Sequence, residues 1–362
     1  MKKFLSLVLA LVMTMSLVTV SAGAKDFTDN SKINYKEAVD VMSAAKVIDG
    51  YAEGDFRPST TLTRGAAAKI ICNLILGPTT ASALVADAAP YKDVPTNHTF
   101  AGYIAYCQKE GIISGYADGT FKPANSLTGY AFMKMLLGAL GYDAEVEQYT
   151  GANWSINVAK RALNIGLDDD LVGDFNGVKA VNREEACLYA LNTLTADMVE
   201  YDAKTTVSTN GTTVVIAGSK AKEMVNNGNT DGKVFDKDGV MQFAEKYFDN
   251  LSVKKGSDDF ARPANVWKLK AEEIGTYTNT PDATYTKKVE NGDIYKDLGL
   301  GSKIEAKDVS VYEDGVKKTN TVAIEKGDDT KVGNSGNGVL TEVFYDDDAD
   351  TVTVTQINTY VG

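Results

Sequence analysis

The stretch GIISGYADGTFKPANSLT, from Gly111 to Thr128, decides how this chain folds. Sixty-five residues earlier, from Lys46 to Thr63, the chain reads KVIDGYAEGDFRPSTTLT. Both stretches contain a Gly-Tyr-Ala step, a phenylalanine, a basic residue followed by proline, and a closing Leu-Thr. A match kept at a fixed period indicates that each copy is one structural unit of a repeat protein.

A more diverged third copy lies 54 residues further on and reads LDDDLVGDFNGVKAVNREE. Four columns keep one register through all three copies. They are Tyr35, Phe100 and Trp154; Val39, Ile104 and Val158; Phe56, Phe121 and Phe175; and Leu62, Leu127 and Val181. Three repeats are the usual minimum at which such units bury one another's apolar faces. We therefore predict a compact helical unit over residues 26–200, with the three phenylalanines buried.

Each copy predicts two helices joined by the long Gly-rich loop. Apolar residues recur at helical spacing over residues 35–45 and 100–110. Thr63, Thr128 and Asn182 precede the second helices and are expected to be their N-caps, because a hydroxyl or amide oxygen there can accept a free backbone N–H.

These residues resemble the S-layer homology module of bacterial cell-surface proteins. The module begins with an aromatic-x-Asp step, seen as Phe27-Thr28-Asp29 and Tyr91-Lys92-Asp93. It continues through a Gly-Tyr and Phe-Arg-Pro loop to a helix that opens with Thr-Arg-Ala-Glu, seen as Thr63-Arg64 and Asn182-Arg183. The resemblance covers about residues 26–200 and implies helix-loop-helix repeats arranged as a trimer about a pseudo-threefold axis.

The predicted fold class is a multidomain α+β chain. An all-α trimer of repeats comes first, and a mainly-β domain, sandwich or barrel-like, comes last because short β-type runs are separated by regular turn signals. The expected divisions are a signal peptide at 1–24, repeats at 25–85, 88–142 and 143–202, a mixed segment at 203–257, and the β-rich domain at 258–362.

Residues 1–24 combine two lysines, an apolar run and a small-residue Ala-Gly-Ala site, which is typical of a secretory signal. The run is shorter than the roughly 20 residues that span a bilayer, so cleavage is favoured over a membrane anchor. The formal net charge is −12 and becomes −14 once Lys2 and Lys3 are removed, so the surface repels nucleic acid and anionic membranes. We expect a secreted protein of the cell wall or S-layer of a Gram-positive-type bacterium.

The basic residues of the repeats point to a binding function. Arg64, Arg183 and Lys122 recur near helix starts beside the Gly loops, where free amides and a guanidinium can hold a carboxylate or phosphate. The alternative is a surface cation paired with Asp or Glu. The resemblance implies that such grooves hold anionic, often pyruvylated, secondary cell-wall polysaccharide. The candidate polymer-binding residues are Arg64, Arg183, Gly50, Gly115, Asp29, Asp93, Trp154 and Lys122. In repeat two, Gly129 stands where the arginine belongs, so that groove is expected to be weak or silent.

A calcium loop is the other candidate site. Asn227, Asn229, Asp231 and Asp238 match the oxygen-ligand spacing of a 12-residue calcium loop. Asn at the first position and Asp at the last depart from that pattern, and an ordinary Asn-Gly turn explains the same residues. No other cofactor is expected.

Nothing in the sequence singles out a catalytic group. The one histidine, His98, has no nucleophile motif beside it, and Cys72, Cys107 and Cys187 read as small buried hydrophobes, one on a helix of each repeat. We therefore expect a non-catalytic surface protein that is anchored through its repeats and displays a β-rich domain, with other S-layer subunits as further partners. The alternative is a wall-anchored glycan or peptide hydrolase with its activity in or beyond the C-terminal half.

Overall fold

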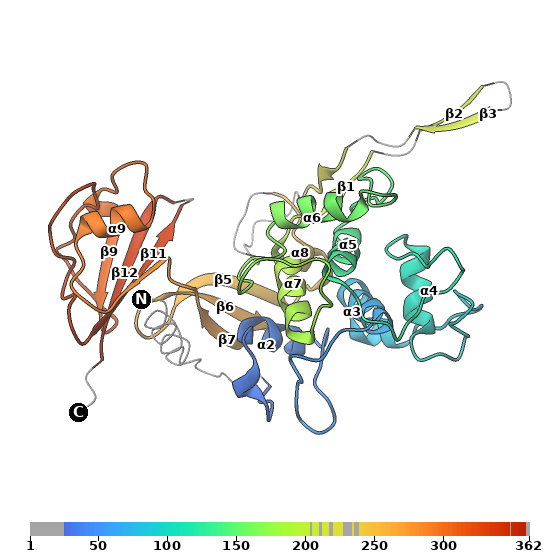
Figure 1. The fold of residues 1–362 in the computed structure, drawn as a ribbon, viewed down its shortest axis with the longest axis horizontal. Coiled ribbons are helices and arrows are strands. Elements are labelled where there is room, and N and C mark those ends of the chain that lie inside the picture. The colour runs from blue at the N-terminus through green and yellow to red at the C-terminus, as the bar shows by residue number, and fades with distance from the viewer. Residues whose placement is uncertain are drawn as a thin grey trace. The chain divides into compact units, whose positions relative to one another are not determined.

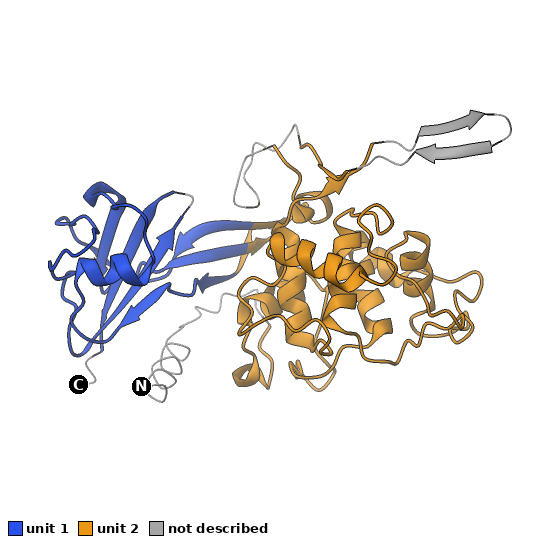
Figure 2. Ribbon diagram, turned by 45° about the horizontal axis from the view of Figure 1, so that its top comes forward, with its two compact units in different colours: residues 1–20, 253–267, 275–362 blue, residues 21–252, 268–274 orange. Residues whose placement is uncertain are grey.

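The computed structural model describes residues 25–202, 205–209, 212–216, 220–226, 234, 239–347 and 349–359 (Figure 1). Among these, one compact unit comprises residues up to 252 together with 268–274, and the second comprises 253–267 and the residues from 275 onward (Figure 2). The predicted signal peptide, residues 1–24, lies outside the described residues. The predicted α+β chain with an N-terminal helical region is confirmed.

The first unit is built mainly from helices. They are α2 (Lys36–Ala44), α3 (Arg64–Ser82), α4 (Ala101–Lys109), α5 (Gly129–Ala139), α6 (Trp154–Asn164), α7 (Arg183–Thr195) and α8 (Phe243–Tyr247), with the short 3-10 helix η1 (Asn30–Lys32). The predicted N-caps are confirmed, because the side chains of Thr63, Thr128 and Asn182 accept backbone N–H groups at the starts of α3, α5 and α7. Within the described residues, no helix combines the length and apolar character that a bilayer crossing requires.

The helices pack in a circular order. The first helix of each copy packs on the second helix of another copy: α4 on α3, α6 on α5, and α2 on α7. Backbone hydrogen bonds close a ring between the three loops, since Leu62 donates to Val181 (2.8 Å), Leu127 to Leu62 (2.9 Å) and Val181 to Leu127 (2.9 Å). Each helix start is thereby fixed against the loop of a different repeat.

The column of phenylalanines is buried in two repeats out of three. Phe56 is 0% exposed and Phe121 is 1% exposed, as predicted. The prediction is wrong for Phe175, which is only half-buried. Its ring meets Tyr130 and Tyr189 edge-on at 5.9 and 6.1 Å, and no arginine stacks above it as happens in the other two repeats.

Strands make up most of the remaining chain. They are β1 (Val199–Glu200), β2 (Thr205–Thr209), β3 (Thr212–Ile216), β4 (Lys222–Glu223), β5 (Leu251–Ser257), β6 (Pro263–Leu269), β7 (Glu272–Thr278), β8 (Ala283–Tyr285), β9 (Val309–Glu313), β10 (Val316–Lys317), β11 (Val339–Asp346) and β12 (Thr351–Asn358). Strands β1 and β4 form one pair, β2 and β3 form another, and β5, β6 and β7 form a three-stranded sheet.

The second unit contains a five-stranded sheet of order β10-β9-β12-β11-β8. Only the β12–β9 pair is parallel. A core of valines from this sheet, including Val311, Val343 and Val354, packs with Ile294 of helix α9 (Asn291–Asp297) and with loop residues that include Ile324. A 3-10 helix, η2 (Ala306–Asp308), precedes β9. The predicted sandwich or barrel-like packing is not confirmed by this arrangement.

Candidate functional site

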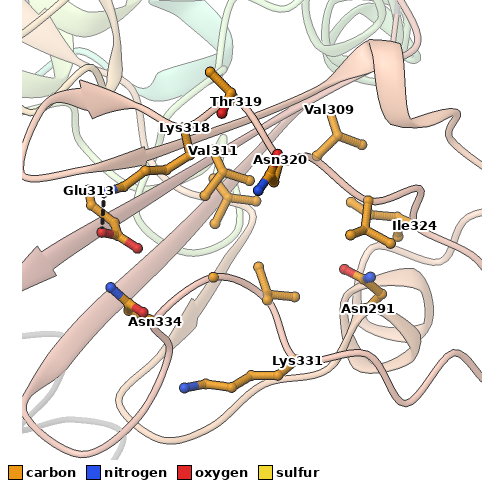
Figure 3. Close-up of a pocket in the computed structure, with 14 residues that line it drawn as sticks. Asn291, Val309, Val311, Glu313, Lys318, Thr319, Asn320, Ile324, Lys331 and Asn334 are labelled. Carbon is orange, nitrogen blue, oxygen red and sulfur yellow. Dashed lines mark ion pairs between the residues drawn. The ribbon is translucent and has the colours of Figure 1, made fainter.

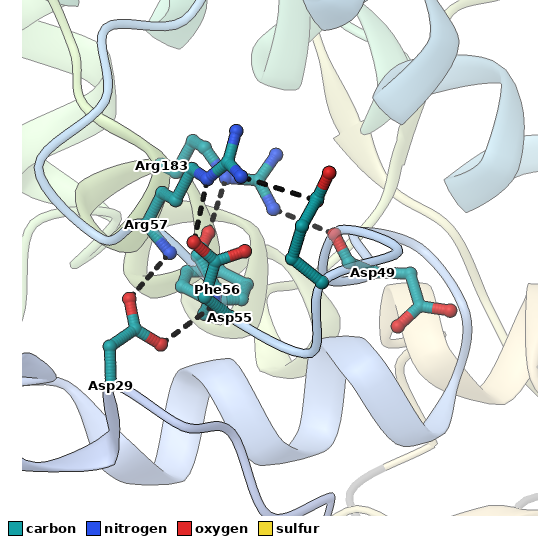
Figure 4. A network of polar contacts seen from close by, with 7 residues as sticks. Asp29, Asp49, Asp55, Phe56, Arg57 and Arg183 are labelled. Atoms are coloured by element: carbon teal, nitrogen blue, oxygen red, sulfur yellow. Dashed lines mark hydrogen bonds and ion pairs between the residues drawn. The ribbon is translucent and has the colours of Figure 1, made fainter.

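Arg57 of the repeat-one loop lies beside Arg183 at the start of α7 (Figure 4). Both guanidinium groups lie over the ring of Tyr51, and these three side chains together are called the first groove. Arg183 donates from Nε to the Phe56 carbonyl (2.9 Å) and from a terminal nitrogen to the Asp49 carbonyl (2.6 Å). The two guanidinium carbons lie 4.1 and 4.8 Å from the centre of the Tyr51 ring. Tyr51 is 36% exposed and has two cations close to its ring.

Asp29 fixes the shape of this loop. Its carboxylate accepts the backbone N–H groups of Phe56 (2.7 Å) and Arg57 (2.8 Å), which holds Arg57 in a left-handed conformation with φ 58°. Burial by itself would raise the pKa of Asp29, but these two backbone hydrogen bonds lower it below its usual value. Asp29 therefore fixes the backbone of the loop that carries Arg57.

The second groove repeats this arrangement with Tyr116 and Lys122 of the repeat-two loop and Arg64 at the start of α3. Arg64 donates to the carbonyls of Phe121 (2.8 Å) and Ser114 (3.1 Å). Its guanidinium carbon lies 5.1 Å from the Tyr116 ring centre, and Lys122 Nζ lies 4.4 Å from that centre. Tyr116 is 44% exposed.

Asp93 supports the second groove as Asp29 supports the first. It accepts the backbone N–H groups of Phe121 and Lys122, each at 2.7 Å, and Lys122 has a φ of 57°. Burial by itself would raise the pKa of the Asp93 carboxyl, but these backbone hydrogen bonds lower it below its usual value. Two loops of different sequence thus keep one internal geometry.

Gly50 and Gly115 are required by close packing. A side chain at Gly50 would collide with the Phe27 ring, and one at Gly115 would collide with the Tyr91 ring. Neither glycine has a left-handed backbone, so the reason for glycine at both positions is steric rather than conformational. Both residues let the loop lie against the aromatic ring that opens the repeat.

In the part of the chain that the structure describes, the two arginines form no ion pair with a carboxylate. Among the described residues, neither Arg64 nor Arg183 forms an ion pair, and their side-chain hydrogen bonds go to backbone carbonyls. Arg57 differs, since it pairs with Asp55 (2.7 Å) and Glu53 (3.2 Å). Partial burial lowers the pKa of Arg64, but a guanidinium remains charged at neutral pH. Within the described residues, the alternative of an ordinary surface ion pair is not seen for either arginine.

The corresponding place between repeats two and three is chemically different. Gly129 stands at the start of α5, and the next residue, Tyr130, packs against the rings of Trp154 (6.4 Å) and Phe175 (5.9 Å). Lys134 lies over Trp154 at 5.7 Å, and burial lowers its pKa. A Cβ at Gly129 would lie 3.1 Å from the Gly177 Cα and 3.2 Å from the Phe175 ring, so the facing loop leaves little room for a side chain here.

Two segments, residues 26–68 and 90–129, match the family model of the S-layer homology domain. These segments hold both complete loops. These two segments of the chain are S-layer homology domains. The third copy lies outside both matched segments.

Several proteins similar to this chain carry the names of surface-layer or cell-wall proteins. A surface layer protein of Brevibacillus choshinensis is 26% identical over 92% of this chain and 32% of its own length. A cellulosome-anchoring protein of Acetivibrio thermocellus is 34% identical over 29% of this chain and 24% of its own length. The chain thus spans about a third or less of these relatives. Its predicted place, secreted to the cell wall or S-layer of a Gram-positive-type bacterium, is confirmed.

The structure brings some of the predicted binding residues together in the two grooves and places another elsewhere. Arg64, Arg183 and Lys122 line the two grooves, whereas Trp154 lies at the third place. The sequence reasoning missed Tyr51, Tyr116 and Arg57 as groove residues. The signal was present, because the Gly-Tyr step and the basic residue before proline recur in both loops.

The predicted calcium ligands Asn227, Asn229, Asp231 and Asp238 lie outside the described residues. In the part of the chain that the structure does describe, no three histidine, cysteine, aspartate or glutamate side chains come together as a metal site.

The second unit holds a pocket of about 340 Å³ over the five-stranded sheet (Figure 3). Val309, Val311 and Val354 of the sheet are among the residues that line it, and asparagines and lysines contribute polar groups. Glu313 is the one carboxylate among the residues that line this pocket, and it pairs with Lys318 at 2.5 Å.

Proposed function

We propose that the two grooves bind an acidic, pyruvylated secondary cell-wall polysaccharide and that this binding anchors the chain to the wall. The observation that carries the proposal is the pair of guanidinium groups that form no ion pair among the described residues, each held in place by two carbonyls beside an exposed tyrosine. In a chain of net charge −12, such cations are suited to an external anion.

Each groove offers two kinds of contact to an acidic sugar. The guanidinium can donate a charge-assisted hydrogen bond to a carboxylate, and that geometry is already set because Arg183 is fixed by the Phe56 and Asp49 carbonyls. The exposed face of Tyr51 or Tyr116 can pack on a sugar ring. A second cation, Arg57 or Lys122, lies over the same tyrosine. An anionic sugar is therefore favoured over a neutral one.

The proposal includes a pseudo-threefold arrangement of repeats at residues 25–85, 88–142 and 143–202. The ring of hydrogen bonds between Leu62, Leu127 and Val181 supports this arrangement. It also includes two active grooves rather than three, because Gly129 and the packed Tyr130 ring leave no guanidinium at the third place. The grooves then act as two linked sites, which strengthens attachment to a repeating polymer.

We further propose that the protein is non-catalytic and that residues 258–362 form a displayed domain that contacts other S-layer subunits. The names of several relatives favour this reading. The alternative is a wall-anchored hydrolase, which is favoured by one relative in Bacillus anthracis whose name is uncharacterized cell wall amidase, 26% identical over 41% of this chain. Against a glycosidase, the Figure 3 pocket offers a single carboxylate where a pair is needed.

The test is co-sedimentation of the mature protein with purified wall sacculi, before and after the secondary polymer is stripped from them. We expect sedimentation with intact sacculi and loss of binding after stripping. Equal binding to both preparations would show that the peptidoglycan itself, or a non-specific contact, holds the protein. An assay for sugar or peptide release in the same samples separates the hydrolase alternative.

A further inference from the structure

Two of the three cysteines lie against each other in the core. Cys72 on α3 and Cys107 on α4 have their sulfur atoms 3.6 Å apart, although 35 residues separate them in the chain. Both side chains are 0% exposed. The two helices belong to different repeats, and the sulfurs also approach the carbonyls of Tyr103 (3.5 Å) and Ala68 (3.7 Å) on the facing helix. Cys187, on α7, takes no part in this contact.

We propose that Cys72 and Cys107 form a disulfide while the exported chain folds, and that this bond links repeats one and two. The two sulfurs are 3.6 Å apart in the folded chain, so they have to approach by roughly 1.6 Å to reach the bonding distance of about 2 Å. The protein is secreted, and disulfides form and persist outside the cytoplasm. The bond would fix α3 against α4. Because Arg64 is the first residue of α3, the bond would also help to hold Arg64 in the second groove.

The oxidant in this step is another disulfide, either a small-molecule disulfide or that of an oxidoreductase. The Cys107 thiolate attacks one oxidant sulfur, so a mixed disulfide forms and the first oxidant thiol leaves. The Cys72 thiolate then attacks the Cys107 sulfur, which forms the protein disulfide and releases the second oxidant thiol. The two protein thiols lose two electrons and two protons, and the oxidant is reduced to two thiols.

The reaction of Cys107 with the oxidant has to take place before α3 and α4 are fully packed, and the attack by Cys72 follows as the two helices come together. Contact with Cys72 and burial raise the pKa of the Cys107 thiol, so in the closed repeats it stays protonated and is a poor nucleophile. Its full burial also keeps an oxidant away. The same burial protects the bond from reductants once it has formed, as is typical of structural disulfides.

The test is a count of free thiols in the secreted protein. The mature chain is extracted from the cell surface in denaturant that contains N-ethylmaleimide, and its intact mass and peptides are measured. We expect one alkylated cysteine, Cys187, and a peptide pair joined through Cys72 and Cys107. Three alkylated cysteines, or a link that involves Cys187, overturn the proposal. The control Cys187→Ala should show no alkylation and the same linked peptides.

A thermal unfolding experiment tests whether the disulfide stabilises the contact between repeats one and two. Closing a 35-residue loop is expected to raise the melting temperature by about 5–10 °C relative to the reduced protein. Reductant added in the unfolded state should remove this rise in wild type and in Cys187→Ala. Cys72→Ala cannot form the bond and should not respond to reductant. A wild-type melting temperature that ignores reductant overturns the claim that the bond links the repeats.

Discussion

Replacing Arg183 with alanine tests whether the first groove is a binding site. The substitution removes the positive charge, the two hydrogen bonds to the Phe56 and Asp49 carbonyls, and the cation beside the Tyr51 ring. A charge-assisted hydrogen bond to an anionic ligand contributes about 1.5–3 kcal/mol. Binding at this groove should therefore weaken about 10- to 150-fold, since 1.4 kcal/mol corresponds to a factor of ten.

The cost to folding should be much smaller. Arg183 is half-buried and makes two hydrogen bonds to backbone carbonyls, so the loss of stability should be about 1 kcal/mol. The helical circular-dichroism signal should be unchanged. Arg64→Ala should behave in the same way in the second groove. Because the two grooves are separate, the double substitution should nearly abolish binding.

The assay is a binding isotherm of the purified mature protein on sacculi that retain their secondary polymer. Lys69→Ala is the matched control, because it removes one positive charge from an exposed position on α3, outside both grooves. Arg183→Lys keeps the charge but loses the planar fork, so it should bind more weakly than wild type. If the double arginine variant binds as tightly as Lys69→Ala, the assignment of both grooves fails.

Four further outcomes are expected. Phe121→Ala should lower the free energy of unfolding by about 3 kcal/mol in urea titrations, and Phe175→Ala by clearly less because its ring is half-buried; equal losses would contradict the burial argument. Gly129→Arg should not raise the affinity for sacculi, because its Cβ would lie only 3.1 Å from the Cα of Gly177 in the facing loop. Tighter binding would show that the loop can move to admit the side chain. Burial would raise the folded-state pKa of Asp29, but its backbone hydrogen bonds lower that pKa below the unfolded value of about 4. The ionised carboxylate therefore stabilises the fold above about pH 4, and this stabilisation is lost as the pH falls through the folded-state pKa. Asp29→Asn should therefore flatten the fall in melting temperature between about pH 5 and pH 2, and an unchanged profile would contradict this. Calorimetry of the mature chain with calcium should show a weak site at residues 227–238, with a dissociation constant on the order of a millimolar; no heat and no change in melting temperature would remove it.

The repeats and their helix starts could be predicted from the sequence because their signals are local. A capping oxygen at Thr63 or Asn182 acts on a backbone group three residues away, and the register of Phe56 and Phe121 follows from a fixed period. Such features depend on short-range chemistry that one sequence records. The aspartates also recur in register, but their target, the backbone of a loop 27 or more residues later, appears only in the folded chain.

Contacts between repeats could not be predicted in this way. Nothing in the spacing shows that Arg183 lies over a loop 127 residues earlier, or that Cys72 touches Cys107. For Phe175, the column predicted burial, but the covering cation is missing because Gly129 occupies the arginine position in the facing helix. The burial of a ring in this fold therefore depends on a residue of another repeat, which a column within one repeat does not contain.

The circular packing explains why the repeats differ in chemistry. Each groove takes its loop from one repeat and its arginine from another: Arg183 of repeat three completes the loop of repeat one, and Arg64 of repeat one completes that of repeat two. The diverged third loop has lost both the tyrosine and the basic residue, and the helix start that faces it has lost its arginine. A site of this kind needs both its loop residues and the arginine of the facing helix. Without the tyrosine and the basic residue in the third loop, an arginine at position 129 would have no such groove to complete. Repeat three thus contributes through Arg183 and through its place in the ring, even though its own loop forms no groove of this kind.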